Sequence, residues 1–121
     1  MKPAPDVLAE PGSELSDADL IGRSRQDPAS FAAIFERHAD EILRYALARL
    51  GPDLAEEVVA EVFLIAFARR DSYDLSRADA RPWLYGIAVR QIGRHRRAQA
   101  RRLRLLQSAP AEPAAEDIGD R

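Results

Sequence analysis

The fold of this chain is decided by residues 82–107, which read PWLYGIAVRQIGRHRRAQARRLRLLQ. In the first half of this stretch, apolar residues recur at three- and four-residue steps, as they do on the buried face of a helix. Past Gly93 the pattern changes, and arginines occur on more than one face. We therefore expect one long helix, with Pro82 in its first turn, that is anchored in a core and then leaves it as a cationic arm.

Three further helices are expected before this one. Ser16 and Asp17 are suited to capping a helix start, because their side chains accept hydrogen bonds from free backbone N–H groups. Pro28 and Gly51 mark the start and the end of the next helix. The four expected ranges are 17–25, 28–50, 53–70 and about 81–107. No strand alternation appears, so the fold class is all-α, a compact four-helix domain with a long C-terminal basic helix.

The same periodicity predicts which side chains form the core. On the second helix, the inward row includes Phe31, Ile34, Phe35, His38 and Ile42. On the third helix two rows are expected, and they consist of Leu54, Val58, Val62 and Ile65, and of Val59, Phe63 and Phe67. On the fourth helix the inward stripe is Trp83, Leu84, Ile87, Ala88, Gln91 and Ile92.

Length and composition limit the class of protein. A chain of 121 residues suffices for one domain. The sequence contains no cysteine, which excludes a disulfide scaffold and a thiolate zinc site and fits a reducing cytosol. No apolar run approaches the roughly 20 residues that a membrane span needs, and the start lacks the apolar core of a secretory signal. We expect a disordered lead-in over 1–15, the helical domain over 16–107 and an acidic linker or tail over 108–121.

Charge is distributed unevenly along the chain. The net charge is −2, but residues 81–111 contain eight Arg and no Asp or Glu. Acidic residues gather at 53–61, on the third helix, and at 112–120, in the tail. Separated blocks of opposite sign indicate different partners for different faces of the domain.

No group of residues points to catalysis. The sequence has two His, too few for a metal cluster made of His alone. Glu57 and Glu61 lie one helical turn apart and could hold a metal. Di-iron bundles also need a second helix on which a His follows a carboxylate after three residues, and that pattern is missing here. No Gly-rich phosphate loop occurs. We therefore expect no catalytic residue, no metal and no cofactor.

The residues that favour nucleic-acid binding lie on the fourth helix and in the loop before it. Arg90, Arg94, Arg97 and Arg101 follow one helix face, where they can neutralise phosphates and release counterions. The loop over 71–80 is long for a compact domain, which favours a functional role. An aromatic side chain beside a basic helix can stack on an unpaired base. The expected DNA-binding set is Tyr73, Asp74, Arg81, Trp83, Arg90, Arg94, Arg96, Arg97 and Arg101.

Three segments carry a family resemblance. They are DPASFAAIFERH at 27–38, AEEVVAEVFLIAF at 55–67 and RPWLYGIA at 81–88, followed by the arginine-rich helix. In this order and at these separations they resemble region 2 of the extracytoplasmic-function (ECF) sigma factors, which belong to the sigma-70 family. The resemblance covers about residues 16–106.

The resemblance implies a role in transcription initiation, in the cytoplasm of a bacterium. The surface with Glu56, Glu57, Glu61 and Phe63 corresponds to the one that docks on the β′ clamp helices of core RNA polymerase. The loop over 71–80 corresponds to the one that captures a base flipped from the non-template strand of the promoter −10 element, and the helix from Trp83 onward to the element that meets the −10 region. An anti-sigma factor is a further partner that many members have.

The chain departs from the family at several positions. Ala60 stands where Gln is frequent, and Arg90 and Arg94 stand where Asn and Asp are frequent. The base preference of the family is therefore not carried over, whereas binding to the phosphate backbone is strengthened. The sequence ends in what resembles the linker to region 4, so no region 4 is expected here.

Two other functions remain open from the sequence alone. A helix-turn-helix regulator of duplex DNA would need a short turn before its recognition helix, and the ten-residue loop argues against it. A protein-interaction module without DNA contact is compatible with the mixed charge of the helix faces.

Overall fold

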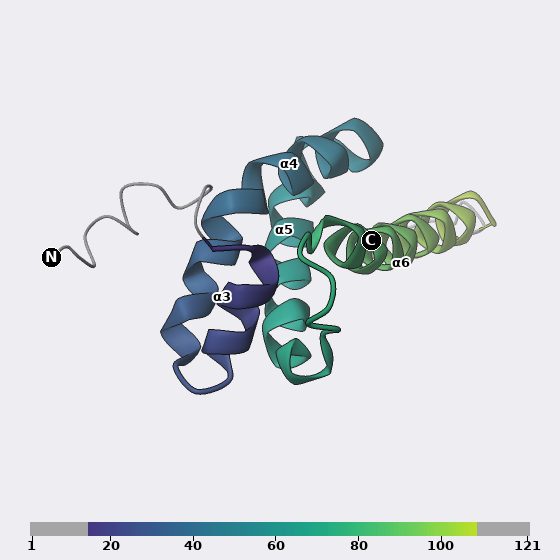
Figure 1. The fold of residues 1–121 in the computed structure, drawn as a ribbon. Coiled ribbons are helices and arrows are strands. Elements are labelled where there is room, and N and C mark those ends of the chain that lie inside the picture. Colours follow the sequence, from purple (N-terminus) through teal and green to yellow (C-terminus); the bar gives the residue numbers. More distant parts are fainter. Residues whose placement is uncertain (1–14, 109–121) are drawn as a thin grey trace, which may run out of the picture.

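The computed structural model describes residues 15–108, and within this range the chain forms helices and no strand. The order of elements is α3 (Asp17–Ser24), the short 3-10 helix η1 (Pro28–Phe31), α4 (Ala32–Leu50), α5 (Pro52–Ala68), the 3-10 helix η2 (Arg70–Ser72) and α6 (Arg81–Ser108). Figure 1 shows α4 and α5 side by side, with α3 against the first part of α4. The expected all-α fold of four helices is confirmed.

α3 begins with the cap that the sequence predicts. The Oγ of Ser16 accepts a hydrogen bond from the backbone N of Asp19 at 3.0 Å, and the Asp19 carboxylate accepts one from the backbone N of Ser16, also at 3.0 Å. This reciprocal pair is a capping box. Asp17 takes no part in it, so the expectation that Ser16 and Asp17 together cap the helix is wrong for Asp17.

Asp17 is instead a buried hub that joins three parts of the chain. Its carboxylate accepts hydrogen bonds from Nη1 of Arg37 at 2.9 Å and from the backbone N of Ala80 at 2.8 Å, and Nε2 of His38 lies 2.9 Å from it. Burial alone would raise the pKa of Asp17, but the bonds with His38, Ala80 and Arg37 outweigh it and lower the pKa to about 2. One carboxylate thus fixes α3 against α4 and against the start of α6.

Two arginines tie the end of α3 to the end of α5. The Arg25 guanidinium donates to the carbonyl oxygens of Arg70 and Tyr73, at 2.9–3.2 Å. The Arg70 guanidinium donates in return to the carbonyl oxygens of Ser24 and Phe67. Carbonyl groups at helix ends have few partners inside the helix, and the two guanidinium groups supply additional donors there.

α4 and α5 form the centre of the core. Gly51 joins them with φ of 84°, a backbone conformation that side chains disfavour, and Pro52 then begins α5. Ile34, Ile42, Val58 and Val62 are almost fully buried between the helices. His38 is also buried, as expected from its row, but Phe35 is wrong as a core residue: it is 46% exposed, and its ring meets that of Phe63 at 5.1 Å.

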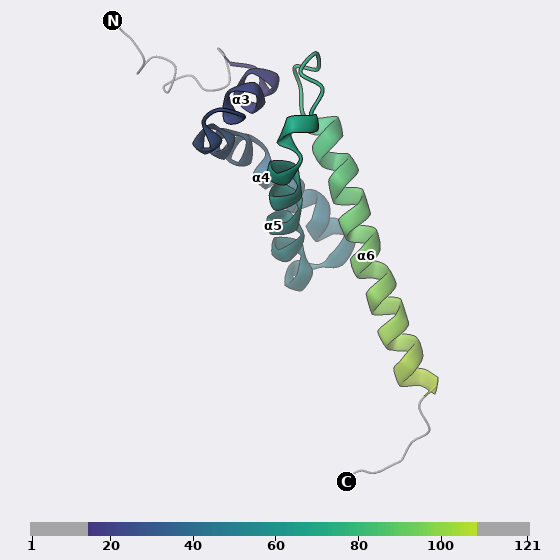
Figure 2. The same cartoon turned by 90° about the horizontal axis from the view of Figure 1, so that it is seen from below.

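α6 divides into a buried half and an exposed half. Leu84, Ile87, Ala88 and Ile92 are buried against α4 and α5, and every residue from Gln99 to Ser108 is exposed. The helix has 28 residues, about 42 Å at 1.5 Å per residue. Figure 2 shows it running beside α5 and continuing well past the body of the domain. The change at Gly93 in the sequence marks this division correctly.

Helix boundaries agree with expectation to within a few residues. The second expected helix begins with the separate turn η1, and the third ends two residues early, before η2. The expected lead-in over 1–15 and tail over 108–121 lie, apart from Leu15 and Ser108, outside the described residues. Among the described helices, none combines the length and the apolar character that crossing a membrane requires.

The Asp17 hub yields a stability prediction. Asp17→Asn keeps the shape of the side chain but removes its negative charge. The Arg37 guanidinium then loses the carboxylate that it pairs with in the wild type. We therefore expect the free energy of unfolding at pH 7 to fall by about 3 kcal/mol. The folded pKa lies below the ordinary 3.8, so the stabilisation is complete above about pH 4 and is lost as the pH falls towards 2. Denaturant unfolding from pH 7 to pH 2 measures both effects.

The control is Asp40→Asn, because Asp40 is exposed on α4. We expect it to change stability by less than about 0.5 kcal/mol. The difference in the free energy of unfolding between the wild type and Asp17→Asn should shrink as the pH falls below 4. The role given to Asp17 is contradicted if the two proteins are equally stable at pH 7, or if the full difference in stability persists at pH 2.

Candidate nucleic-acid and protein interface

A strip of arginines follows the exposed side of α6 from Arg90 onward. Its members in the described part of the chain are Arg90, Arg94, Arg96, Arg97, Arg101, Arg102 and Arg104, all exposed. Among the described residues, Arg96 makes one hydrogen bond, from Nη2 to the carbonyl oxygen of Arg49 at 3.3 Å, and no acidic side chain pairs with the others. Along a helix that projects beyond the core, the structure therefore places a set of cations that no described acidic side chain neutralises.

Arg81 differs from this strip. It stands at the first position of α6, where its guanidinium donates to the Asp79 carboxylate at 3.1–3.2 Å. Its Nη1 also lies 3.9 Å from Glu41. Because acids of the loop and of α4 hold it, Arg81 is engaged in fixing the start of α6, although its side chain stays half exposed.

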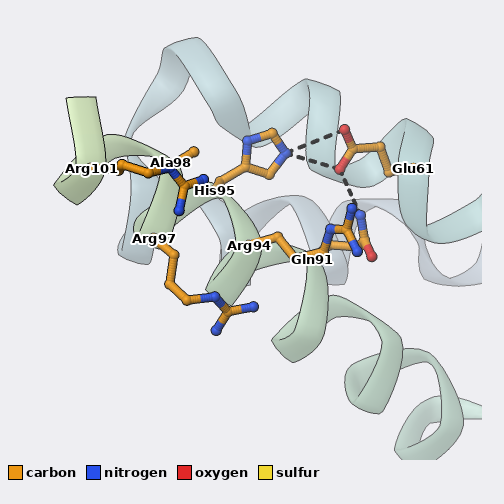
Figure 3. Close-up of a pocket in the computed structure, with 7 residues that line it drawn as sticks. All are labelled: Glu61, Gln91, Arg94, His95, Arg97, Ala98 and Arg101. Atoms are coloured by element: carbon orange, nitrogen blue, oxygen red, sulfur yellow. Dashed lines mark hydrogen bonds and ion pairs between the residues drawn. The ribbon is translucent and has the colours of Figure 1, made fainter.

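A polar hollow lies where the strip meets α5. It is lined by Glu61, Gln91, Arg94, His95, Arg97, Ala98 and Arg101. Figure 3 shows Glu61 reaching from α5 to Gln91 and His95 of α6. Nε2 of Gln91 donates to Glu61 at 3.1 Å, and Nε2 of His95 lies 3.0 and 3.2 Å from the two carboxylate oxygens.

The partners of Glu61 also set its charge. Burial would raise the pKa of Glu61, but the bonds with His95 and Gln91 outweigh it and leave the pKa below its ordinary value. Glu61 is therefore a carboxylate at neutral pH, and it joins the helix that carries the acids to the helix that carries the arginines.

The loop between η2 and α6 is ordered by its own side chains. The hydroxyl of Tyr73 donates to the carbonyl oxygen of Arg77 at 2.6 Å, and Asp74 accepts from the backbone N and the hydroxyl of Ser76. The hydrogen bonds from Ser76 lower the pKa of Asp74. The exposed side of the loop forms a shallow hollow lined by Asp74, Ser76, Arg77, Ala78, Asp79 and Pro82.

The expectation that the ring of Tyr73 lies open for stacking is wrong. Tyr73 is 5% exposed, and its ring meets that of Trp83 edge to face, with 4.8 Å between the centroids. The Tyr73 ring is buried between the loop and the core, and its hydroxyl holds the loop through the bond to Arg77. Trp83 is partly buried beside it and marks the edge of the loop. Sequence periodicity could not reveal this, since Tyr73 lies outside any helical repeat.

The acidic surface of α5 is smaller than expected. Glu56 and Glu57 are exposed, but Glu61 turns towards α6. Phe63, which the sequence places both in a core row and in the polymerase-binding set, is 7% exposed and packs against Phe35, so the core prediction is confirmed and its ring is not open on the surface. Leu64, which the sequence did not single out, is 70% exposed one turn beyond Ala60 on the same helix. The outer face of α5 therefore combines two carboxylates with an apolar side chain.

The predicted site residues thus fall into three groups. Asp74, Arg81 and Trp83 cluster at the loop end of α6, with Tyr73 beneath them. The arginines from Arg90 to Arg101 lie farther along the helix, with about 27 Å of axis between positions 83 and 101. Glu56 and Glu57 are exposed on α5, and the carboxylate of Glu57 lies near that of Glu61 and near the imidazole of His95. The interaction of His95 with Glu61 was missed, although Gln91 and His95 at a spacing of four share one helix face.

Comparison with known protein families gives a match over most of the helical domain. The family model for Sigma-70 region 2 matches residues 34–102, which include α5, the loop and most of α4 and α6. Neither the curated proteins nor the solved structures yielded a match to this chain.

The Tyr73 hydroxyl gives a test of how the loop is held. Tyr73→Phe keeps the ring contact with Trp83 and removes the bond to Arg77, so we expect a loss of about 1 kcal/mol in stability and faster amide exchange over 74–79. The matched control is Tyr85→Phe, which removes a hydroxyl that donates to Glu41 of α4 at 2.7 Å and not to a residue of the loop. Equal exchange over 74–79 in both variants would contradict the anchoring role.

Proposed function

Because the chain belongs to the sigma-70 region 2 family, we propose that it is an initiation module of the ECF type, acting in the bacterial cytoplasm. Membership of this family implies binding to core RNA polymerase and a part in promoter melting. The finer proposal is that the module captures bases of the non-template strand at the −10 element. The observation that carries it is helix α6: one end is buried in the core, and the other presents exposed arginines that have no acidic partner among residues 15–108.

The arginine strip supports contact with the phosphate backbone. Phosphates lie at regular intervals along a strand, and a straight helix with cations on successive turns can follow several of them. Arg94, Arg97 and Arg101 share a face beside the hollow in Figure 3 and have no acidic partner among the described residues. Their charge is therefore available to an anion from outside.

The loop end of α6 supports base capture. Its hollow is lined by hydrogen-bonding groups of Asp74, Ser76 and Arg77, next to Pro82. The loop backbone is held by Tyr73 and by the Ala80 amide, so an incoming base would meet an ordered surface. Extruding a base costs a few kcal/mol, which contacts of this kind can offset without any bond chemistry.

The outer face of α5 is the surface we propose for the polymerase. Glu56 and Glu57 offer negative charge, and exposed Leu64 offers apolar area for burial. A patch of this composition suits a partner helix with basic and apolar side chains. In this proposal Phe63 supports the surface from behind, and an anti-sigma factor would be a competitor for the same faces.

The two alternatives make different demands on the molecule. A helix-turn-helix regulator would bind duplex DNA more tightly than single strands, with a recognition helix after a short turn; here the segment between η2 and α6 covers 73–80. A pure protein-interaction module would bind polymerase without any contribution from the arginines. Variants of the arginine strip and of the outer face of α5 distinguish both alternatives from the proposed function.

The first test removes the strip. Arg94→Ala, Arg97→Ala and Arg101→Ala combined should weaken binding of single-stranded −10 DNA by tenfold or more, and make the slope of log K against log salt less negative by about 2. Fluorescence anisotropy across a salt series, with core polymerase present, measures both. The control combines Arg23→Ala, Arg44→Ala and Arg69→Ala, three exposed arginines elsewhere. If both triple variants lose the same affinity, the strip has no special role.

The second test reverses the charge of the polymerase surface. Glu56→Lys with Glu57→Lys should lower the affinity for core polymerase by about tenfold, because a basic partner surface would then be repelled. Glu36→Lys with Asp40→Lys is the matched control, since both residues are exposed and one turn apart on α4. Co-purification and a binding titration with core polymerase measure the effect. Unchanged affinity of the α5 variant would exclude this surface.

A further inference from the structure

A histidine of α6 completes a ligand set that α5 begins. Glu57 and Glu61 lie one turn apart on α5, and His95 approaches them from α6. One ligand atom from each of the three residues can be chosen so that all lie within 4.8 Å of one another. We propose that Glu57, Glu61 and His95 bind one divalent transition-metal ion, for which zinc is the best candidate, between the two helices.

The spacing of the ligand atoms fits a single ion. Zinc binds imidazole nitrogen and carboxylate oxygen at about 2.0–2.2 Å, so ligands around one ion lie roughly 3–3.5 Å apart. His95 and Glu61 already meet this spacing at 3.0 and 3.2 Å. Glu57 is exposed, and its side chain can rotate the short remaining distance without disturbing the core.

The surroundings of Glu61 resemble the support that metal ligands receive. Gln91, one turn before His95 on α6, donates to Oε1 of Glu61 at 3.1 Å and so fixes the direction of the carboxylate. Hydrogen bonds of this kind orient metal ligands in proteins. The side chains of Glu61 and His95 are 29% and 18% exposed, which leaves a path for an ion and still shields it partly from solvent.

The chemistry of the ligands selects the ion. Imidazole suits zinc and its neighbours in the transition series, whereas magnesium and calcium prefer all-oxygen sites. Three protein ligands leave a fourth position for water or for a group from a partner. The sequence lacks the two-helix carboxylate–histidine repeat of di-iron bundles, so a single ion is expected rather than a pair.

Metal binding would change both neighbouring surfaces. An ion held by Glu57 and Glu61 neutralises part of the acidic face of α5, and it adds positive charge beside Arg94, Arg97 and Arg101. We therefore expect zinc to weaken binding to core polymerase. The effect of zinc on polymerase binding rests on the proposed function, whereas zinc binding itself does not. A zinc titration without polymerase therefore tests the metal site independently of the proposed function.

The experiment is calorimetric titration of zinc into the untagged full chain, with cobalt as a spectroscopic probe. We expect one zinc per chain, visible d–d absorption from bound cobalt, and a rise in the unfolding temperature that grows with the zinc concentration. Glu57→Gln, Glu61→Gln and His95→Gln should each weaken zinc binding by at least about tenfold. Magnesium at the same concentration should produce no comparable shift.

The matched control is Glu56→Gln, which removes an exposed carboxylate of α5 that lies outside the ligand set. It should bind zinc as the wild type does. Glu57 is exposed, so Glu57→Gln tests the site without risk to the fold. The proposal is overturned if wild type takes up no zinc, if any one of the three ligand variants keeps full affinity, or if Glu56→Gln loses as much as they do.

Discussion

The carboxylate of Asp17 holds together groups that are far apart in the sequence. Its partners Arg37, His38 and Ala80 lie 20, 21 and 63 residues away along the chain. A buried charge is stable only when hydrogen bonds replace the water it has lost, so all three partners have to be in place together. This requirement fixes where α3 meets α4 and where the loop passes into α6. The loop hollow and the direction of α6 both follow from it.

The direction of α6 in turn decides which surfaces the domain offers. Its first half is held by Leu84, Ile87 and Ile92, so the second half must project with its arginines in solvent. Where the buried half ends, Glu61 of α5 meets Gln91 and His95, and the acidic and basic surfaces are joined at that one contact. A strand bound along α6 and a protein bound on α5 would therefore lie on either side of Glu61. The same junction provides the ligand set proposed for zinc.

Much of this fold could be predicted from the sequence, because helices leave a period of three and four residues and because Pro28, Gly51 and Pro82 mark their ends. The division of α6 at Gly93 was visible for the same reason. Contacts between elements were not visible. The partners of Asp17, the anchoring of Tyr73 under the loop and the pairing of Glu61 with His95 depend on how the helices pack. Phe35 of α4 and Phe63 of α5 show where prediction from periodicity stops. The period places both side chains near the core, but only the packing of the helices decides that Phe63 is buried and Phe35 is exposed. The roles given to the site residues stay predictions.

The most direct test of the central claim is photocrosslinking of the chain to a labelled non-template strand in a complex with core RNA polymerase. Photoreactive bases would be placed one at a time through the −10 element, in single-stranded and in fully paired form. We expect the chain to join core polymerase and crosslinks to single-stranded bases to map to the loop over 73–80 and to the arginines of α6, with weaker crosslinks from paired DNA. No association with core polymerase, or crosslinks that favour the duplex, would contradict the central claim.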